Sequence, residues 1–300
     1  MKKTAIALAV LAGTLVATGA FAQSATQILN RSAVNSVKEL HTHQLVSALN
    51  ADCVAGTGEK DSCFGMGVAN YAATNVFAES NTVNAVYSYQ LDQRLRIGAT
   101  VETENSNFIP ANKTLTSAPM FGVFAVWRHD GNALGPAIRL SAGRQTEYSK
   151  YVNEQGYPTY MQAQGAQLEF NTSGVTESGV FLQPYVGLRT TEFIMFNPLN
   201  AQAVLPALRP SRQDTITGGV RGAYQMTETV GLTFGIGLER DLAKRLEGSG
   251  ANERTRYVGD AGVAFRTARE SQIEVALGYA DQSWNEGAST LLKVGFKQAF

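Results

Sequence analysis

The sequence has few of the residues that carry chemistry. Its 300 residues include two cysteines and three histidines, and only 17 % are charged. Nucleophilic catalysis needs a nucleophile with a base in reach, and a metal centre needs several ligands at suitable spacing. The histidines are His41, His43 and His129, and "EGSGAN" has Glu247 where a GxSxG elbow has its first glycine. We therefore expect no enzyme activity, no metal and no cofactor.

Charge of one sign and long apolar runs are also missing. The chain has 25 basic and 25 acidic residues, with no basic tail. This balance gives no indication of a nucleic-acid partner. After the first 22 residues there is no run of 18 apolar residues, so helical membrane spans are excluded.

The first 22 residues have the pattern of a secretory signal peptide. Lys2 and Lys3 precede the apolar stretch "AIALAVLAGTLVATGA", and "AFA" before Gln23 places small residues at −1 and −3. We expect cleavage after Ala22 and a mature protein outside the cytoplasm.

From residue 62 onward the sequence alternates between apolar and polar residues. One example has Val230, Leu232 and Phe234 on one face, with Thr233 and Glu239 on the other. Glycine is abundant, at 29 residues, which fits many short strands joined by turns. Each segment has about the 9 to 12 residues with which a tilted strand crosses a bilayer. The expected strands are 62–73, 80–91, 94–104, 119–129, 135–146, 160–171, 178–190, 213–225, 229–240, 255–266, 270–280 and 289–300.

Short and long connections alternate between these strands. The short ones include "DQ" and "TET", and the long ones reach "TEFIMFNPLNAQAVLPALRPSR". This asymmetry is typical of an outer-membrane barrel, with tight periplasmic turns and longer external loops. The sequence therefore predicts an all-β fold, a twelve-stranded antiparallel transmembrane β-barrel over residues 62–300.

The charged residues fall on the parity opposite to the apolar one. Charges facing lipid at mid-depth would cost about 2–4 kcal/mol each, so this parity should face the lumen. Arg144 breaks the pattern near a strand end. Two interpretations stay open: an open pore that favours anions, and a narrow lumen in which opposite charges pair. The expected lumen-lining charges are Arg94, Arg96, Glu102, Arg139, Glu169, Arg189, Arg221, Glu239, Arg256, Asp260, Arg266, Glu274, Lys293 and Lys297.

Residues 23–61 precede the barrel and have a different period. Leu29, Val37, Leu40 and Leu49 recur at helical spacing, which indicates an amphipathic helix within residues 24–50. Such a helix is about 10–12 Å wide, near what a twelve-stranded barrel accommodates. It either plugs the pore or remains a periplasmic tail.

Both cysteines, Cys53 and Cys63, follow this helix. A close pair in an exported protein favours a disulfide that closes a small loop. Two free thiols are the alternative, and a metal site would need further ligands, for which His41 and His43 are the nearby candidates.

Together these features resemble the translocator (β-domain) of bacterial autotransporters. The resemblance covers residues of about 24 to 300 and includes the helix before twelve strands, "FLQPYVGLRTTEF", "DTITGGVRGAYQM" and the terminal strand ending in Phe300. It implies a helix that traverses the pore. In that family a secreted passenger precedes the helix, whereas here almost nothing lies between the expected cleavage site and the helix.

The expected function is a structural or translocator-type barrel in the bacterial outer membrane. The alternatives are a small-solute channel with an anion-leaning lumen, and an adhesin acting through its loops, of which residues 192–210 are unusually apolar. We expect a monomer whose partners are outer-membrane lipid and the barrel assembly machinery. Phe300 resembles the terminal signal that this machinery reads.

Overall fold

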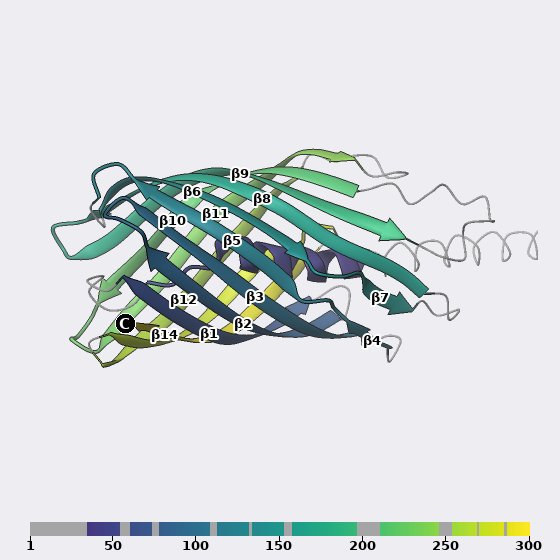
Figure 1. The fold of residues 1–300 in the computed structure, drawn as a ribbon, viewed down its shortest axis with the longest axis horizontal. Coiled ribbons are helices and arrows are strands. Elements are labelled where there is room, and N and C mark those ends of the chain that lie inside the picture. The colour runs from purple at the N-terminus through teal and green to yellow at the C-terminus, as the bar shows by residue number, and fades with distance from the viewer. Residues whose placement is uncertain are drawn as a thin grey trace, which may run out of the picture.

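The fold is a closed antiparallel barrel (Figure 1). A computed structural model describes residues 35–54, 61–73, 78–108, 113–131, 134–152, 158–196, 211–245, 254–268, 270–284 and 287–300. The expected signal peptide therefore lies outside the described residues. The strands are β1 Ser62–Ala73, β2 Ala78–Gln90, β3 Leu95–Phe108, β4 Lys113–Thr116, β5 Met120–Arg128, β6 Gly135–Gln145, β7 Ser149–Val152, β8 Pro158–Val175, β9 Val180–Phe196, β10 Ser211–Gln225, β11 Val230–Arg245, β12 Thr255–Ala268, β13 Ser271–Asp281 and β14 Ala288–Ala299.

Twelve of these strands form the barrel wall, which confirms the predicted fold class. Neighbours in sequence pair antiparallel, and β1 pairs with both β2 and β14, which closes the sheet. The four-residue strands β4 and β7 add to the rim beside β3 and β8. Among the described wall strands, closure leaves no exposed sheet edge, as a bilayer requires.

The two ends of the barrel differ. The turn end carries the connections 91–94, 176–179 and 226–229 together with the start of β1 and the end of β14. There Phe300 N donates to Ser62 O at 2.9 Å, which ties the last residue to the first strand. The loop end carries the longer connections, and β8 and β9 project furthest toward it (Figure 1).

Several strand limits differ from the expectation. Strand β9 continues to Phe196, so residues 192–196 belong to a strand rather than to the expected loop. Strand β8 runs from Pro158 to Val175, beyond both predicted limits. Arg94 lies in the turn before β3 and not within a strand.

The exterior is apolar. Val123, Leu140, Ile236 and Leu277 are exposed on the outer face, where burial in lipid replaces burial in protein. Arg144 also points outward; it lies near the loop end and donates to Gln162 Oε1 at 3.2 Å.

A helix over residues 35–50 lies inside the barrel (Figure 1). It begins near the loop end, and residues 51–54 continue from it toward the turn end, where Cys53 meets Cys63 at the start of β1. The tail interpretation of this segment is therefore wrong for residues 35–50. No helix in the described part of the chain is long and apolar enough to cross a membrane.

Candidate functional site

The helix rests against a row of glycines on the inner wall. Gly122 of β5 pairs with Gly143 of β6, which pairs with Gly165 of β8. A Cβ atom at Gly143 would lie 3.0 Å from Leu45 Cδ1, and one at Gly165 would lie 2.9 Å from Leu45 Cδ2. The missing side chains leave the groove that Leu45 occupies. We call these three residues the glycine row.

Apolar contacts around the helix form a core at the loop end. Leu40, Leu45 and Leu49 of the helix are fully buried, and Phe193 and Met161 of the wall pack in the same cluster. This loop-end core puts apolar residues inside the barrel at the level of the helix.

Polar contacts join the helix to several strands. Gln44 Nε2 donates to the carbonyl of Glu102 at 3.2 Å, and Ser47 Oγ donates to the Glu102 carboxylate at 2.6 Å. Gln145 Nε2 lies 3.1 Å from both His41 Nδ1 and Gln44 Oε1. Burial lowers the pKa of His41 to about 3, so its ring is neutral and Nδ1 accepts the bond.

The connection between β13 and β14 clamps the helix at the loop end. Trp284 is buried, its backbone N donates to Glu39 Oε2 at 2.8 Å, and its indole Nε1 donates to Thr42 Oγ1 at 2.8 Å. Its ring meets Phe193 edge-on and lies 4.7 Å from Lys38 Nζ. The clamp thus combines hydrogen bonds, an aromatic pair and a cation–π contact.

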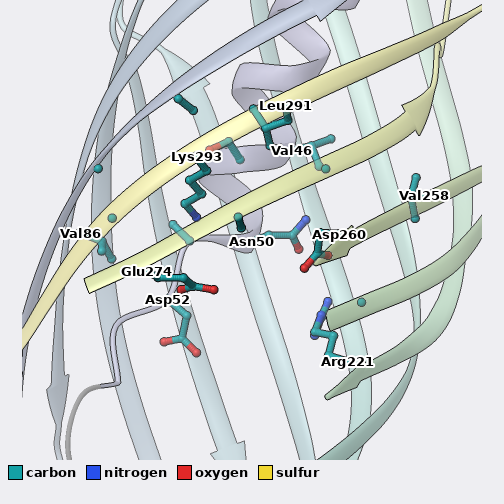
Figure 2. Close-up of a pocket in the computed structure, with 18 of the residues that line it drawn as sticks. Val46, Asn50, Asp52, Val86, Arg221, Val258, Asp260, Glu274, Leu291 and Lys293 are labelled. Atoms are coloured by element: carbon teal, nitrogen blue, oxygen red, sulfur yellow. The ribbon is translucent and has the colours of Figure 1, made fainter. Parts of the chain in front are cut away.

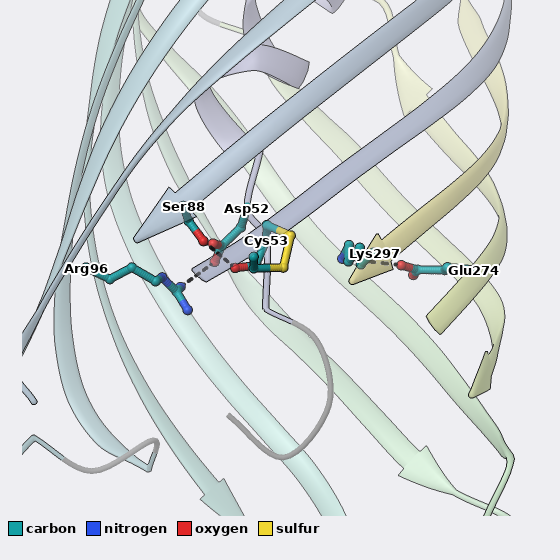
Figure 3. Close-up of a disulfide and its surroundings, with 7 residues drawn as sticks. Asp52, Cys53, Ser88, Arg96, Glu274 and Lys297 are labelled. Carbon is teal, nitrogen blue, oxygen red and sulfur yellow. Dashed lines mark hydrogen bonds and ion pairs between the residues drawn. A yellow bond between two sulfur atoms is a disulfide. The ribbon is translucent and has the colours of Figure 1, made fainter. Parts of the chain in front are cut away.

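Arginines hold the other end of the helix. Arg139 Nη2 donates to the carbonyls of Leu49 and Ala51, which satisfies acceptors that a helix C-terminus leaves unpaired. Arg96 Nη2 lies 2.8 Å from Asp52 Oδ2 (Figure 3). Burial raises the pKa of Asp52, but the guanidinium groups of Arg96 and Arg139 outweigh it and hold the pKa below its ordinary value.

A cavity of about 570 Å³ lies between the helix and the turn end and extends along the side of the helix that carries His43, Val46 and Ser47. Figure 2 shows Lys293, Asp260 and Arg221 around it, with Asn50 and Asp52 from the helix side. Its wall combines charged and polar side chains with apolar ones such as Val86 and Leu291, whereas charged groups are few in the loop-end core. The volume is in the range of small-molecule pockets.

The predicted lumen charges divide between this cavity and three other places. Glu102 lies beside the helix, Arg189 and Arg256 lie in an ion-pair cluster nearer the loop end, and Arg94 and Arg266 lie at the turn end. The cavity wall includes Arg96, Arg139, Glu169, Arg221, Glu239, Asp260, Glu274, Lys293 and Lys297.

Most of these charges lie next to an opposite charge. Arg221 makes two hydrogen bonds to Glu169, at 2.7 and 2.8 Å, and Lys297 lies 3.6 Å from Glu274. Nearer the loop end, Arg189 and Arg256 contact Glu239, at 2.7 and 2.9 Å from its Oε2. Such pairing favours the narrow-lumen interpretation over a pore lined by free basic groups.

Sequence reasoning missed the residues that seat the helix. Trp284, Gln145 and the glycine row were not among the predicted site residues, since alternation shows which face a residue takes but not which partner it meets. Residues 197–210 of the apolar loop lie outside the described residues, so adhesion through it stays a prediction. No cluster of His, Cys, Asp or Glu in the described residues is arranged to hold a metal ion.

Known structures share this architecture. The chain has the fold of outer-membrane β-barrels. The translocator domain of the autotransporter NalP from Neisseria meningitidis matches it with a TM-score of 0.54 at 13 % identity, over 89 % of this chain and 98 % of that one. The β-domain of the Bordetella autotransporter BrkA gives 0.54 at 14 % identity, over 82 % and 100 %.

An outer-membrane channel from Pseudomonas putida F1 gives a TM-score of 0.50 at 10 % identity, over 80 % of this chain and 96 % of that one. No protein-family model and no curated protein matches the sequence. At such identities the likeness concerns the fold, so the barrel resembles translocator domains and channels alike. The expectation that the chain is not an enzyme stays a prediction.

Proposed function

We propose that the protein is a translocator-type outer-membrane barrel whose own helix, residues 35–50, closes the lumen at rest. We call this helix the plug. The observation that carries the proposal is the position of the helix inside the barrel, with Leu40, His41, Gln44, Leu45 and Leu49 fully buried against the wall. Its other side, with His43, Val46 and Ser47, lines the cavity.

The direction of the plug also supports this function. Lys38 donates to Ser211 at the loop end, and Asp52 reaches Arg96 toward the turn end. With the turns in the periplasm, the N-terminal end of the helix faces the outside. A translocator would display the chain that precedes its helix in this direction.

Planar-bilayer current tests the closure. The mature full-length chain should conduct little, and deletion of residues 23–50 should open the barrel, with heat-modifiable gel mobility showing that the deleted chain still folds. An equal current from both proteins would contradict the proposal.

The alternative is a small-solute channel, which the charged cavity favours. Stable current through the full-length chain, with a reversal potential that shows ion preference in a salt gradient, would establish it. The paired charges of the wall predict weak selectivity for either sign.

A further inference from the structure

The disulfide joins the segment that follows the plug to the seam of the barrel, where β1 pairs with β14. Cys53 lies three residues after the helix, and Cys63 lies at the start of β1, where it pairs with Ser88 of β2 and Ala299 of β14. The two Cα atoms are 5.6 Å apart. Ser88 Oγ also donates to the carbonyl of Cys53 at 2.8 Å (Figure 3).

Chain length sets how far the plug could move without this bond. Cys53 and Cys63 are 10 positions apart, and an extended chain of that length spans up to about 33 Å. The helix itself is about 24 Å long at 1.5 Å per residue. A reduced chain is therefore long enough for the whole plug to leave through the loop end, whereas the oxidised chain keeps residue 53 at the seam.

We propose that the Cys53–Cys63 disulfide is a latch that prevents the plug from leaving the lumen. This inference rests on the proposed closure by the helix and adds the covalent bond that keeps the helix in the lumen. Closing a loop of about ten residues reduces the freedom of the released chain by a factor of roughly a hundred. The non-covalent contacts seat the plug, and the latch confines it when those contacts break.

Formation of the latch is a balanced thiol exchange. One cysteine thiolate attacks the disulfide of an oxidised dithiol donor, and the second thiolate then displaces the donor sulfur. In total, the S–S bond of the donor breaks and the Cys53–Cys63 bond forms. The two cysteines are oxidised, and the donor is released as a dithiol that carries the two thiol protons. Cys53 and Cys63 are 1 % and 5 % exposed, because Val86, Phe124 and Val126 of the wall pack with them, and this packing shields the finished bond from thiols.

Planar-bilayer current tests the latch independently of the closure by the plug. Cys53→Ser, Cys63→Ser and the double variant should each raise the ratio of open to closed time about a hundredfold over the oxidised wild type. Dithiothreitol should do the same to the wild type, once maleimide labelling shows two free thiols, and should not change the double variant.

The outcomes distinguish the two proposals. If the serine variants stay as closed as wild type while deletion of residues 23–50 opens the barrel, the latch is wrong and the plug is right. If the deletion fails to open the barrel, both are wrong. Should a serine variant not assemble, reduced wild type in the bilayer answers the same question.

A length test addresses the mechanism itself. Deleting residues 56–60 in the double serine variant reduces the extended reach to about 17 Å, less than the helix length, and should restore closure. Continued opening after this deletion would overturn the reach argument.

Discussion

Gly143 offers a steric test of how the plug is seated. A Cβ atom there would lie 3.0 Å from Leu45 Cδ1 and 3.8 Å from Leu49 Cδ2. Gly143→Val places three carbons where two buried leucines already fill the space. Overpacking of this kind costs about 1–3 kcal/mol, which corresponds to a shift of about 5–150-fold in the ratio of unseated to seated plug. Single-channel recording should show this shift as more frequent openings.

Gly295→Val is the matched control. Gly295 also lies on the luminal face of a strand, but a Cβ atom there would meet only the Met66 carbonyl, at 3.8 Å. Both changes replace a strand glycine by a β-branched residue, so effects on the strand itself are similar. Gly295→Val should open no more often than wild type.

Leu45→Ala supplies the rescue. Alone it should loosen the plug by about 2–5 kcal/mol, because it removes buried methyl groups. In the Gly143→Val background the valine occupies part of the vacated space, so the double variant should be less open than the sum of the single effects, with a coupling of about 0.5–3 kcal/mol. Equal behaviour of the two valine variants, with simple additivity at Leu45, would refute the proposed seat.

Three further expectations follow from the same contacts. Arg139→Met should weaken the seating of the helix by about 1.5–3 kcal/mol, because it removes charged hydrogen bonds to the carbonyls of Leu49 and Ala51. Arg144→Met on the same strand is the control. The open probability in single-channel recordings measures both effects. The pKa of Asp52 is lowered in the folded chain, so its stabilisation of the seated plug is present above the ordinary pKa of about 3.9 and is lost only as pH falls below it. Openings should therefore be unchanged from pH 7 to 5 and increase under stronger acid. The increase should be smaller in Asp52→Asn. Deletion of Phe300 should impair assembly more than stability, so pulse-labelled chain should accumulate uninserted while the inserted fraction keeps its heat-modifiable mobility; normal insertion would leave Phe300 as an ordinary rim aromatic.

The sequence predicts the barrel wherever lipid lies outside and water inside. The alternation of Val230 to Glu239 is of this kind, and β11 includes it. The rule fails beside the plug, where both faces are apolar. Phe193 and Met195 point inward into the loop-end core, so "EFIMF" lacks the regular alternation of a strand and its sequence predicts a loop, although β9 continues through it.

The stretch "MFGVFAVWRH" is apolar on both faces for the same reason. Its inward residues Phe124 and Val126 pack in a second core with Cys53 and Cys63 at the turn end. The contacts that hold the helix against the wall could not be predicted from the sequence. Gly122, Gly143 and Gly165 become a row only through the strand register, and Trp284 meets Thr42 across 242 positions of sequence.

The two cores hold the plug in different ways, one by packing and one by a covalent bond, and current amplitude distinguishes them. The loop-end core seats the helix by packing, while the turn-end core surrounds the covalent latch, and the charged cavity lies between them. In Gly143→Val the latch is intact, so an unseated helix stays in the lumen and openings should be frequent but smaller than those of the helix-deleted barrel. In Cys63→Ser the helix leaves, so openings should reach the full amplitude of the deletion. Full-amplitude openings in oxidised Gly143→Val would show that the latch does not confine the plug.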